Sequence, residues 1–125
     1  MNRIVVTCET VDTVDAPQPR SGHTATLVGK EVVFFGGVVD GQCTSAVDAV
    51  SAIAAKDDDT LTWRRIAPPG IAPSPRLGHA ACAVSSQEVG STELFVFGGG
   101  DGKVLLNDLW ALDPAAAGRW RSPQC

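Results

Sequence analysis

The stretch Pro75-Arg76-Leu77-Gly78-His79, followed by Leu94-Phe95-Val96-Phe97 and Gly98-Gly99, decides the fold of this chain. An earlier stretch repeats the same features in the same order: Pro19-Arg20-Ser21-Gly22-His23, Val32-Val33-Phe34-Phe35 and Gly36-Gly37. A motif that recurs in order, with its spacing nearly kept, indicates a structural repeat. The repeat therefore has to be interpreted before any single residue.

The spacing between the two copies is close to constant. It is 56 residues at the proline of the motif, 62 at the glycine pair and 57 at a later tryptophan, Trp63 and Trp120. An insertion, Ser85–Thr92, stands where the first copy has only Gly29 and Lys30. We expect it to lengthen a turn between two strands and to leave the register of the repeat intact.

Each copy combines a Pro-Arg-x-Gly-His element, an apolar run ending in Gly-Gly, a third strand and a final tryptophan; the third strand of the second copy reads Asn107-Asp108-Leu109-Trp110. In these features the chain resembles the kelch family, from about Pro17 to Trp120. Kelch repeats each fold as one four-stranded blade of a β-propeller. The resemblance implies an all-β fold: a partial kelch propeller of two four-stranded antiparallel blades plus an N-terminal strand of a preceding blade.

This interpretation divides the chain into an N-terminal strand and linker (1–18), a first blade (19–66) and a second blade (67–125). The N-terminal strand is predicted at Ile4–Glu9, with a non-native leader as the alternative. The strands predicted for the blades are His23–Val28, Glu31–Phe35, Val47–Ile53 and Thr62–Ile66, then His79–Val84, Glu93–Phe97, Asp108–Leu112 and a fourth strand starting at Trp120.

One segment carries conflicting signals. Val47–Ile53 and the alanines around it have helical propensity and spacing, whereas the repeat register requires a strand. We favour the strand, because Asp48 aligns with Asp108 of the second copy and a helix would break the blade. Asp57–Asp59 is then predicted as a hairpin apex, and Trp63 and Phe97 as large buried side chains.

The totals describe a globular chain that is too short for a whole propeller. Its 125 residues are 44% hydrophobic, with 13 Gly and 8 Pro. Propellers have about 4 to 8 blades, and two blades alone expose an apolar face at each end. We therefore expect a fragment, or a chain that further blades or a second chain complete.

Charge and motifs argue against several partners. The net charge of −4 leaves no basic stripe for nucleic acid, and the apolar run Ile4–Val6 is too short for a signal peptide or a membrane span. The four cysteines, Cys8, Cys43, Cys82 and Cys125, form no Cys-x-x-Cys pair. Reduced structural thiols are the default expectation, with disulfides or chance reactivity as the alternatives. A cytosolic or nuclear setting is the default, of which we expect the cytoplasmic one.

We predict no catalytic residue, metal or cofactor. The glycine-rich run after Phe97 is followed by a strand pattern rather than by the helix that a phosphate loop needs. Ser21 and His23 lack a third orienting group, and the histidines and cysteines lack the spacing of metal ligands. Kelch-like copper-radical oxidases need a tyrosine, and this chain contains none.

A structural role is predicted for the residues that define the repeat. They are Gly22, His23, Gly36, Gly37, Trp63, Gly78, His79, Gly98, Gly99, Trp110 and Trp120.

Arg20, Ser21 and Arg76 are the predicted partner-binding residues. In kelch propellers similar to this chain, the arginine of the Pro-Arg element lies near the central opening, where a guanidinium can hold acidic peptide groups in a bidentate manner. The alternative is an arginine that bonds loop carbonyls between blades. The resulting function is a non-catalytic scaffold or adaptor that binds a protein partner through propeller loops. A fragment of a propeller enzyme, of the carbohydrate-active or oxidase type, and a truncated non-functional product are the alternatives.

Overall fold

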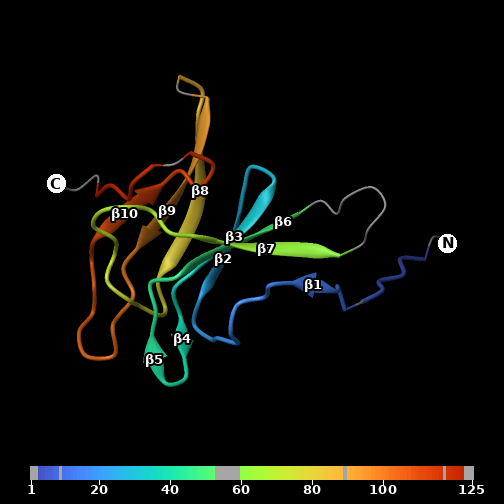
Figure 1. Cartoon of the computed structure of the whole chain (residues 1–125), viewed down its shortest axis with the longest axis horizontal. Coiled ribbons are helices and arrows are strands. Elements are labelled where there is room, and N and C mark those ends of the chain that lie inside the picture. The colour runs from blue at the N-terminus through green and yellow to red at the C-terminus, as the bar shows by residue number, and fades with distance from the viewer. Residues whose placement is uncertain (1–2, 9, 53–59, 89, 117, 123–125) are drawn as a thin grey trace.

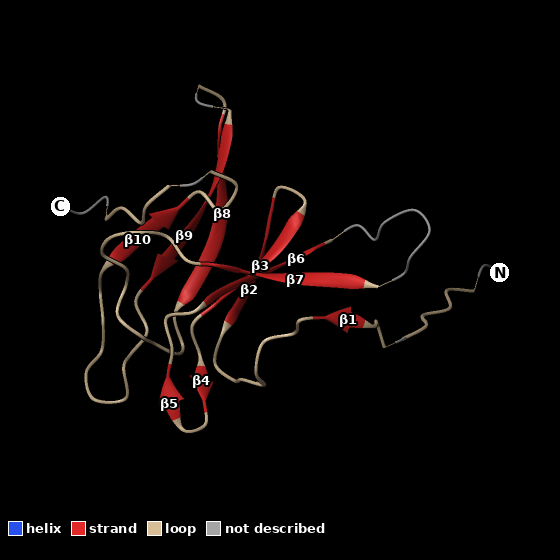
Figure 2. Cartoon of the chain, viewed as in Figure 1, coloured by secondary structure: helices blue, strands red, loops and turns tan. Residues whose placement is uncertain are grey.

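The computed structural model of the chain describes residues 3–8, 10–52, 60–88, 90–116 and 118–122, and in these ranges it contains strands and loops and no helix (Figure 2). The strands form one five-stranded, one three-stranded and one two-stranded sheet. The two larger sheets correspond to the two copies of the repeat, which confirms the predicted all-β partial propeller.

The first blade is the five-stranded sheet, with the strand order β1-β7-β6-β3-β2. Its four antiparallel strands are β2 (Thr24–Val28), β3 (Glu31–Phe35), β6 (Val47–Ser51) and β7 (Leu61–Ile66). The alanine-rich segment is a strand, as the repeat register predicts, because β6 pairs with β3 on one side and β7 on the other. Tertiary pairing overrides helix propensity here. The predicted apex at 57–59 lies outside the described residues.

The second blade keeps three full strands: β8 (Ala80–Ser86), β9 (Ser91–Phe97) and β10 (Leu109–Leu112). Within the described residues its fourth strand is a single bridge, in which the amides of Ala111 and Arg121 each donate to the other's carbonyl at 2.8 and 2.9 Å. The insertion at 85–92 lengthens β8 and β9 into a hairpin that extends beyond the blade (Figure 1).

The N-terminal strand lies further along the chain than predicted. Residues 4–8 form no strand, and Ile4, Val5 and Val6 are 91%, 75% and 87% exposed; residue 9 lies outside the described residues. A two-residue strand, β1 (Thr13–Val14), instead pairs in parallel with the outer strand β7 of the first blade. A strand needs a neighbour, and the described residues include no preceding blade that could provide one for residues 4–8.

The hydrophobic core lies between the two blades. Val33, Phe35 and Ala49 of the first blade are fully buried in one cluster with Leu94 and Val96 of the second, which are 1% and 0% exposed. Trp120 closes this core, with its ring 5.3 Å from that of Phe35. The core is thus the interface between blades, and each blade keeps its other face more open.

Two aromatic residues lie on these open faces. Phe97 occupies in the second blade the position of Phe35, yet it is 49% exposed, because no further blade among the described residues covers it. Trp63 is only partly buried, and packs on Phe34 with their rings 4.9 Å apart. The prediction of a buried side chain is wrong for Phe97 and only partly right for Trp63.

The register between the repeats also corrects one alignment. The amide of Gly36 donates to the carbonyl of Ala46, and that of Gly98 donates to the carbonyl of Asp108. Ala46, and not Asp48, is therefore the structural equivalent of Asp108. Asp48 lies two residues further along the chain, on the same face, because side chains alternate along a β-strand.

The close approach of the blades predicts which glycine is hardest to replace. Gly36 has a φ of +71°, and a Cβ there would lie 2.7 Å from Cε1 of His79 and 2.8 Å from the carbonyl of Arg76, both in the second blade. Its equivalent Gly98 has a similar φ of +70°, but its nearest contact is the Leu106 carbonyl at 3.3 Å. We expect Gly36→Ala to lower the urea midpoint of unfolding far more than Gly98→Ala.

The two substitutions share the cost of a left-handed backbone, about 1–2 kcal/mol, and differ in the contact with the second blade. Equal urea midpoints for the two variants would contradict the close contact of Gly36 with the second blade.

Candidate protein-interaction site at the blade rim

The Pro-Arg element of the second blade holds an ion pair whose arginine is fully buried. The side chain of Arg76 is 0% exposed, and its Nη1 and Nη2 donate to the two carboxylate oxygens of Asp108 at 2.7 and 2.9 Å. Arg76 also donates to the carbonyls of Ser74 and Gly98, both at 3.1 Å. The indole of Trp110 donates to the same carboxylate at 2.7 Å. This arrangement ties the crossing loop, the Gly-Gly element and the third strand together.

The first blade repeats the ion pair with fewer bonds. Nη2 of Arg20 donates to Asp48 at 3.1 Å, and Nε of Arg65 donates to the other oxygen of that carboxylate at 2.7 Å. The Arg20 side chain is 7% exposed, and its buried Nη1 has no hydrogen-bond partner among the described residues. Arg20 therefore retains a donor that its equivalent Arg76 has already used.

The ion pair sets the charge state of Asp108. Hydrogen bonds from Arg76, the larger cause, and from Trp110 lower the pKa of the Asp108 carboxyl from 3.8 to about 2, against the opposing effect of burial. A carboxyl whose pKa is lowered by folding stabilises the fold above its unfolded pKa, and this stabilisation is lost as the pH falls through the folded value.

We therefore expect the urea midpoint of the chain to fall between pH 3.8 and about 2, partly because Asp108 becomes protonated in this interval. Asp108→Asn should be less stable at neutral pH, and its midpoint should change less across the same interval. Parallel pH profiles for the two proteins would contradict the assigned ion pair.

The two histidines of the repeat have different surroundings. His79 is 7% exposed between the blades, with Nε2 2.8 Å from the Thr24 hydroxyl and its ring edge-on to Phe35. Burial, and then the nearby charge of Arg76, lower the pKa of His79 below 6.5, so its ring is neutral at pH 7. The equivalent His23 is exposed on the open side of the first blade, next to Phe34.

The loops of both blades project from the same end of the molecule (Figure 1). One is the hairpin formed by β4 (Val38–Val39) and β5 (Gln42–Cys43). The other is the loop 98–107, where the Asp101 carboxylate accepts hydrogen bonds from two amides of its own loop, at 2.8 and 2.9 Å. Asp40, with a φ of +49°, turns the hairpin.

A cleft of about 560 Å³ opens between the first Pro-Arg element and this hairpin. Gln18, Arg20 and Arg65 line one side, and hairpin residues, Asp40 among them, line the other. We call it the rim cleft. The backbone of Ser21 bridges to Val38, through bonds of 3.2 and 2.7 Å, and fixes the hairpin beside Arg20.

The structure separates the three predicted partner-binding residues. Arg20 lines the rim cleft, the exposed Ser21 does not line it and bonds Val38 of the hairpin through its backbone, and Arg76 is fully buried. The carbonyls that the Arg76 side chain holds, those of Ser74 and Gly98, belong to its own blade, whereas the predicted alternative placed such carbonyls between blades. Arg65 is a cleft residue that the motif comparison missed, because the corresponding position of the second copy is Ser122.

The glycines that define the repeat lie where the chain turns or where blades meet. Gly37 and Gly99 have φ of +97° and +88°, and a Cβ on either would lie 2.6 Å from a carbonyl of the Pro-Arg element, that of Ser21 or Leu77. Gly22 and Gly78, the glycines of the two Pro-Arg-x-Gly-His elements, also have positive φ. The amide of Gly78 donates to the carbonyl of Gly22 across the blades at 3.1 Å.

The described residues show no group of three or more His, Cys, Asp or Glu side chains that could hold a metal ion. The same part of the chain has no helix long and apolar enough to cross a membrane. Cys8, Cys43 and Cys82 are free thiols, and Cys125 lies outside the described residues.

Two stacked antiparallel units, each tied by an arginine, a Gly-Gly pair and a tryptophan, define a repeat protein of the β-propeller class. The sequence model of the KLHDC2/KLHL20/DRC7 Kelch-repeats domain matches residues 6–125. The chain therefore belongs to the kelch-repeat family.

Curated proteins similar to this chain carry different activities in their names. They include serine/threonine-protein phosphatase BSL2 of Arabidopsis thaliana, 36% identical over 109 residues, acyl-CoA-binding domain-containing protein 4 of the same plant, 37% identical over 97 residues, and human host cell factor 2, 30% identical over 115 residues. These matches cover 82%, 78% and 86% of this chain, but only 9%, 13% and 14% of the three relatives. The chain thus spans a small share of each relative.

Proposed function

We propose that this chain is a non-catalytic protein-interaction module that binds its partner at the rim cleft. The observation that carries the proposal is the guanidinium of Arg65, whose side chain is 59% exposed and lines the cleft beside Arg20. An exposed guanidinium in a cleft can donate charge-assisted hydrogen bonds to an acceptor on a ligand.

The chemistry of the rim cleft fits an acidic peptide. Arg20 and Arg65 share one carboxylate, that of Asp48, so their pairing leaves one positive charge in excess. Asp40 also lines the cleft, but from the hairpin side, and within the described residues it pairs with neither arginine. The Arg65 side chain is 59% exposed and can reach a ligand. A carboxylate on a partner would accept a charge-assisted hydrogen bond from the exposed Arg65.

The kelch family supports this class of function, because kelch repeats are generally protein-interaction modules. The activities named in the similar proteins are not transferred, since this chain matches only a small share of each. The net negative charge supports a partner other than nucleic acid. We place this adaptor in the cytoplasm as part of the proposal, because free thiols persist there.

The test is affinity capture with quantitative mass spectrometry, comparing the chain with Arg65→Glu, which reverses an exposed charge in the cleft. Lys30→Glu is the matched control, since Lys30 is exposed in the turn between β2 and β3 and does not line the cleft. We expect proteins that bind the unaltered chain and Lys30→Glu to be lost with Arg65→Glu. The same proteins on all three baits would remove the rim cleft from the proposal.

A further inference from the structure

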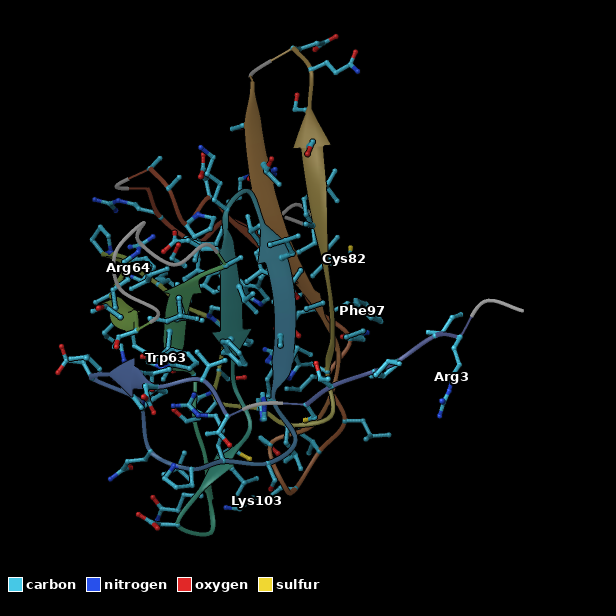
Figure 3. All side chains as sticks on the ribbon, turned by 90° about the vertical axis from the view of Figure 1, so that its right-hand side faces the viewer. Arg3, Trp63, Arg64, Cys82, Phe97 and Lys103 are labelled. Atoms are coloured by element: carbon cyan, nitrogen blue, oxygen red, sulfur yellow. The ribbon has the colours of Figure 1, made fainter. Side chains whose placement is uncertain are left out.

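Each blade has an open face that repeats one side of the interface between the blades. The first blade contacts the second through the side that carries Phe35, and leaves open the side that carries Phe34 and Trp63. The second blade contacts the first through the side that carries Val96, and leaves open the side that carries Phe97. Figure 3 shows Phe97 on one side of the molecule and Trp63 on the other.

The open face of the second blade copies the surface with which the first blade holds its neighbour. Phe97 occupies the position equivalent to that of Phe35, and Gly98 the position equivalent to that of Gly36. The outer ion pair is copied too, in a bidentate form both times: Arg64 with Glu31 at 2.8 and 2.7 Å, and Arg121 with Glu93 at 3.1 and 2.7 Å. In the first blade this arginine also donates across the interface, to the carbonyl of Pro114 at 3.1 Å.

The open face of the first blade copies the opposite surface, the one that the second blade presents to the first. His23 occupies the position equivalent to that of His79, and Trp63 the position equivalent to that of Trp120. The Arg20–Asp48 pair replaces the Arg76–Asp108 pair, with its carboxylate two residues further along the third strand. The two open faces of one chain therefore match the two surfaces that meet at the interface between its blades, and so are complementary to each other.

The second blade has a cleft that could accept the exposed side chain of His23 from another copy. Inside the chain, His79 lies directly over Gly36, in the space that a Cβ would fill. Beside the equivalent Gly98, a cleft of about 760 Å³ is lined by residues that include Phe97 and Leu77. The imidazole of His23 would enter this cleft at the place equivalent to that of His79 beside Phe35.

We propose that the open face of the second blade binds the open face of the first blade of a second copy of this chain. The contact is head-to-tail, and repetition of the rotation that relates the blades closes it into a ring. Propellers have about 4 to 8 blades, so a ring of two, three or four copies falls within the range that the fold allows. This assembly does not depend on which partner the rim cleft binds.

One sequence difference between the two repeats should make the contact between copies weaker than the contact inside the chain. Within the chain the Thr24 hydroxyl bonds the imidazole of His79 at 2.8 Å, whereas the residue equivalent to Thr24 in the second blade is Ala80. The second copy's histidine therefore lacks this partner. We expect an assembly that dissociates on dilution while each chain stays folded.

Light scattering coupled to size-exclusion chromatography tests the assembly on the full 125-residue chain. The expected mass at high concentration is two, three or four times 13.0 kDa. Phe97→Asp and Leu27→Asp each place a charge at a position of one open face that is 49% or 59% exposed, and both should be monomers with unchanged circular dichroism. Ile71→Asp is the control: Ile71 is 80% exposed in the crossing loop, so this variant should assemble as the unaltered chain does.

Mixing the two variants identifies the faces in contact. Phe97→Asp keeps the first blade's open face and Leu27→Asp keeps the second blade's, so an equimolar mixture should form one heterodimer and nothing larger. A monomeric unaltered chain at every soluble concentration would overturn the proposal, and would leave the open faces to further blades or to another protein. A Leu27→Asp variant that still self-associates, or a mixture without the heterodimer, would also overturn it, the first by showing that like faces pair.

Cysteine labelling gives a second readout that does not depend on variants. Cys82 is exposed and borders the apolar open surface of the second blade with Phe95 and Phe97, whereas Cys8 is exposed in the N-terminal segment. Assembly should slow iodoacetamide labelling of Cys82 several-fold at high protein concentration and leave the labelling of Cys8 unchanged, as followed by peptide mass mapping. Equal labelling of Cys82 at high and low concentration would contradict the proposed contact.

Discussion

Arg76→Ala is expected to abolish the cooperative unfolding transition of this chain. Breaking a buried ion pair costs about 3–5 kcal/mol, and a whole domain has about 5–15 kcal/mol in total. Asp108 is 35% exposed, so water compensates part of its lost pairing, but the carbonyls of Ser74 and Gly98 lose their donor as well. The measurement is urea unfolding followed by circular dichroism and tryptophan fluorescence.

Arg20→Ala is the matched comparison in the other copy of the repeat. Its partner Asp48 keeps a second guanidinium, that of Arg65 at 2.7 Å, so the loss should be smaller and a transition should remain. Arg76→Lys should resemble Arg76→Ala more than the unaltered chain, because one ammonium cannot reproduce a bidentate fork. An Arg76→Ala transition as steep and as late as that of the unaltered chain would refute the structural role assigned to this arginine.

Phe35→Ala is the second substitution with a large expected effect. Phe35 is 0% exposed and contacts both Trp120 and His79 between the blades. Emptying a buried phenylalanine site costs about 3–5 kcal/mol. We expect the variant to lose the contact between blades and with it the sharp unfolding transition, in the same urea experiment.

Phe97→Ala provides the control at the equivalent position of the second blade. Since Phe97 is 49% exposed, truncation should cost well under half as much in a monomeric chain. If Phe97→Ala were as damaging as Phe35→Ala in dilute solution, the second blade's open face would have to be covered, and the assignment of the core to a single interface would fail.

The repeat in the sequence predicts most of the fold, because the features that repeat are those that shape a blade. The Gly-Gly pairs and the apolar strands that precede them lie where the register places them. The strand at Val47–Ser51 shows the strength of this signal, since its composition alone favours a helix.

The features that the sequence did not predict depend on what lies next to each blade. Phe35 and Phe97 have the same sequence context, and only the presence of a neighbouring blade decides that one is buried and the other is half exposed. The sequence alignment matches Asp48 to Asp108, although the structural equivalent of Asp108 lies two residues before Asp48. An aspartate in the third strand is visible in the sequence, whereas the pairing of β6 with β3 that fixes the equivalence is not.

The candidate site is harder to predict than the fold. Arg20 and Arg76 are identical in motif, yet only Arg20 lines the rim cleft, since the hairpin of β4 and β5 lies beside it. Arg65 has no repeat partner to draw attention to it, and it lies beside Asp48 only because β6 and β7 pair in the observed register.

The hairpin of β8 and β9 offers a practical attachment point on this molecule. Its outer pairs, Ser85–Thr92 and Ser86–Ser91, join the two strands to each other beyond the blade, so the extra length adds an arm without changing the rest of the sheet. A fluorophore attached near that tip would report on the tumbling of the molecule, and either a fluorophore or an epitope there would leave the rim cleft accessible to a partner.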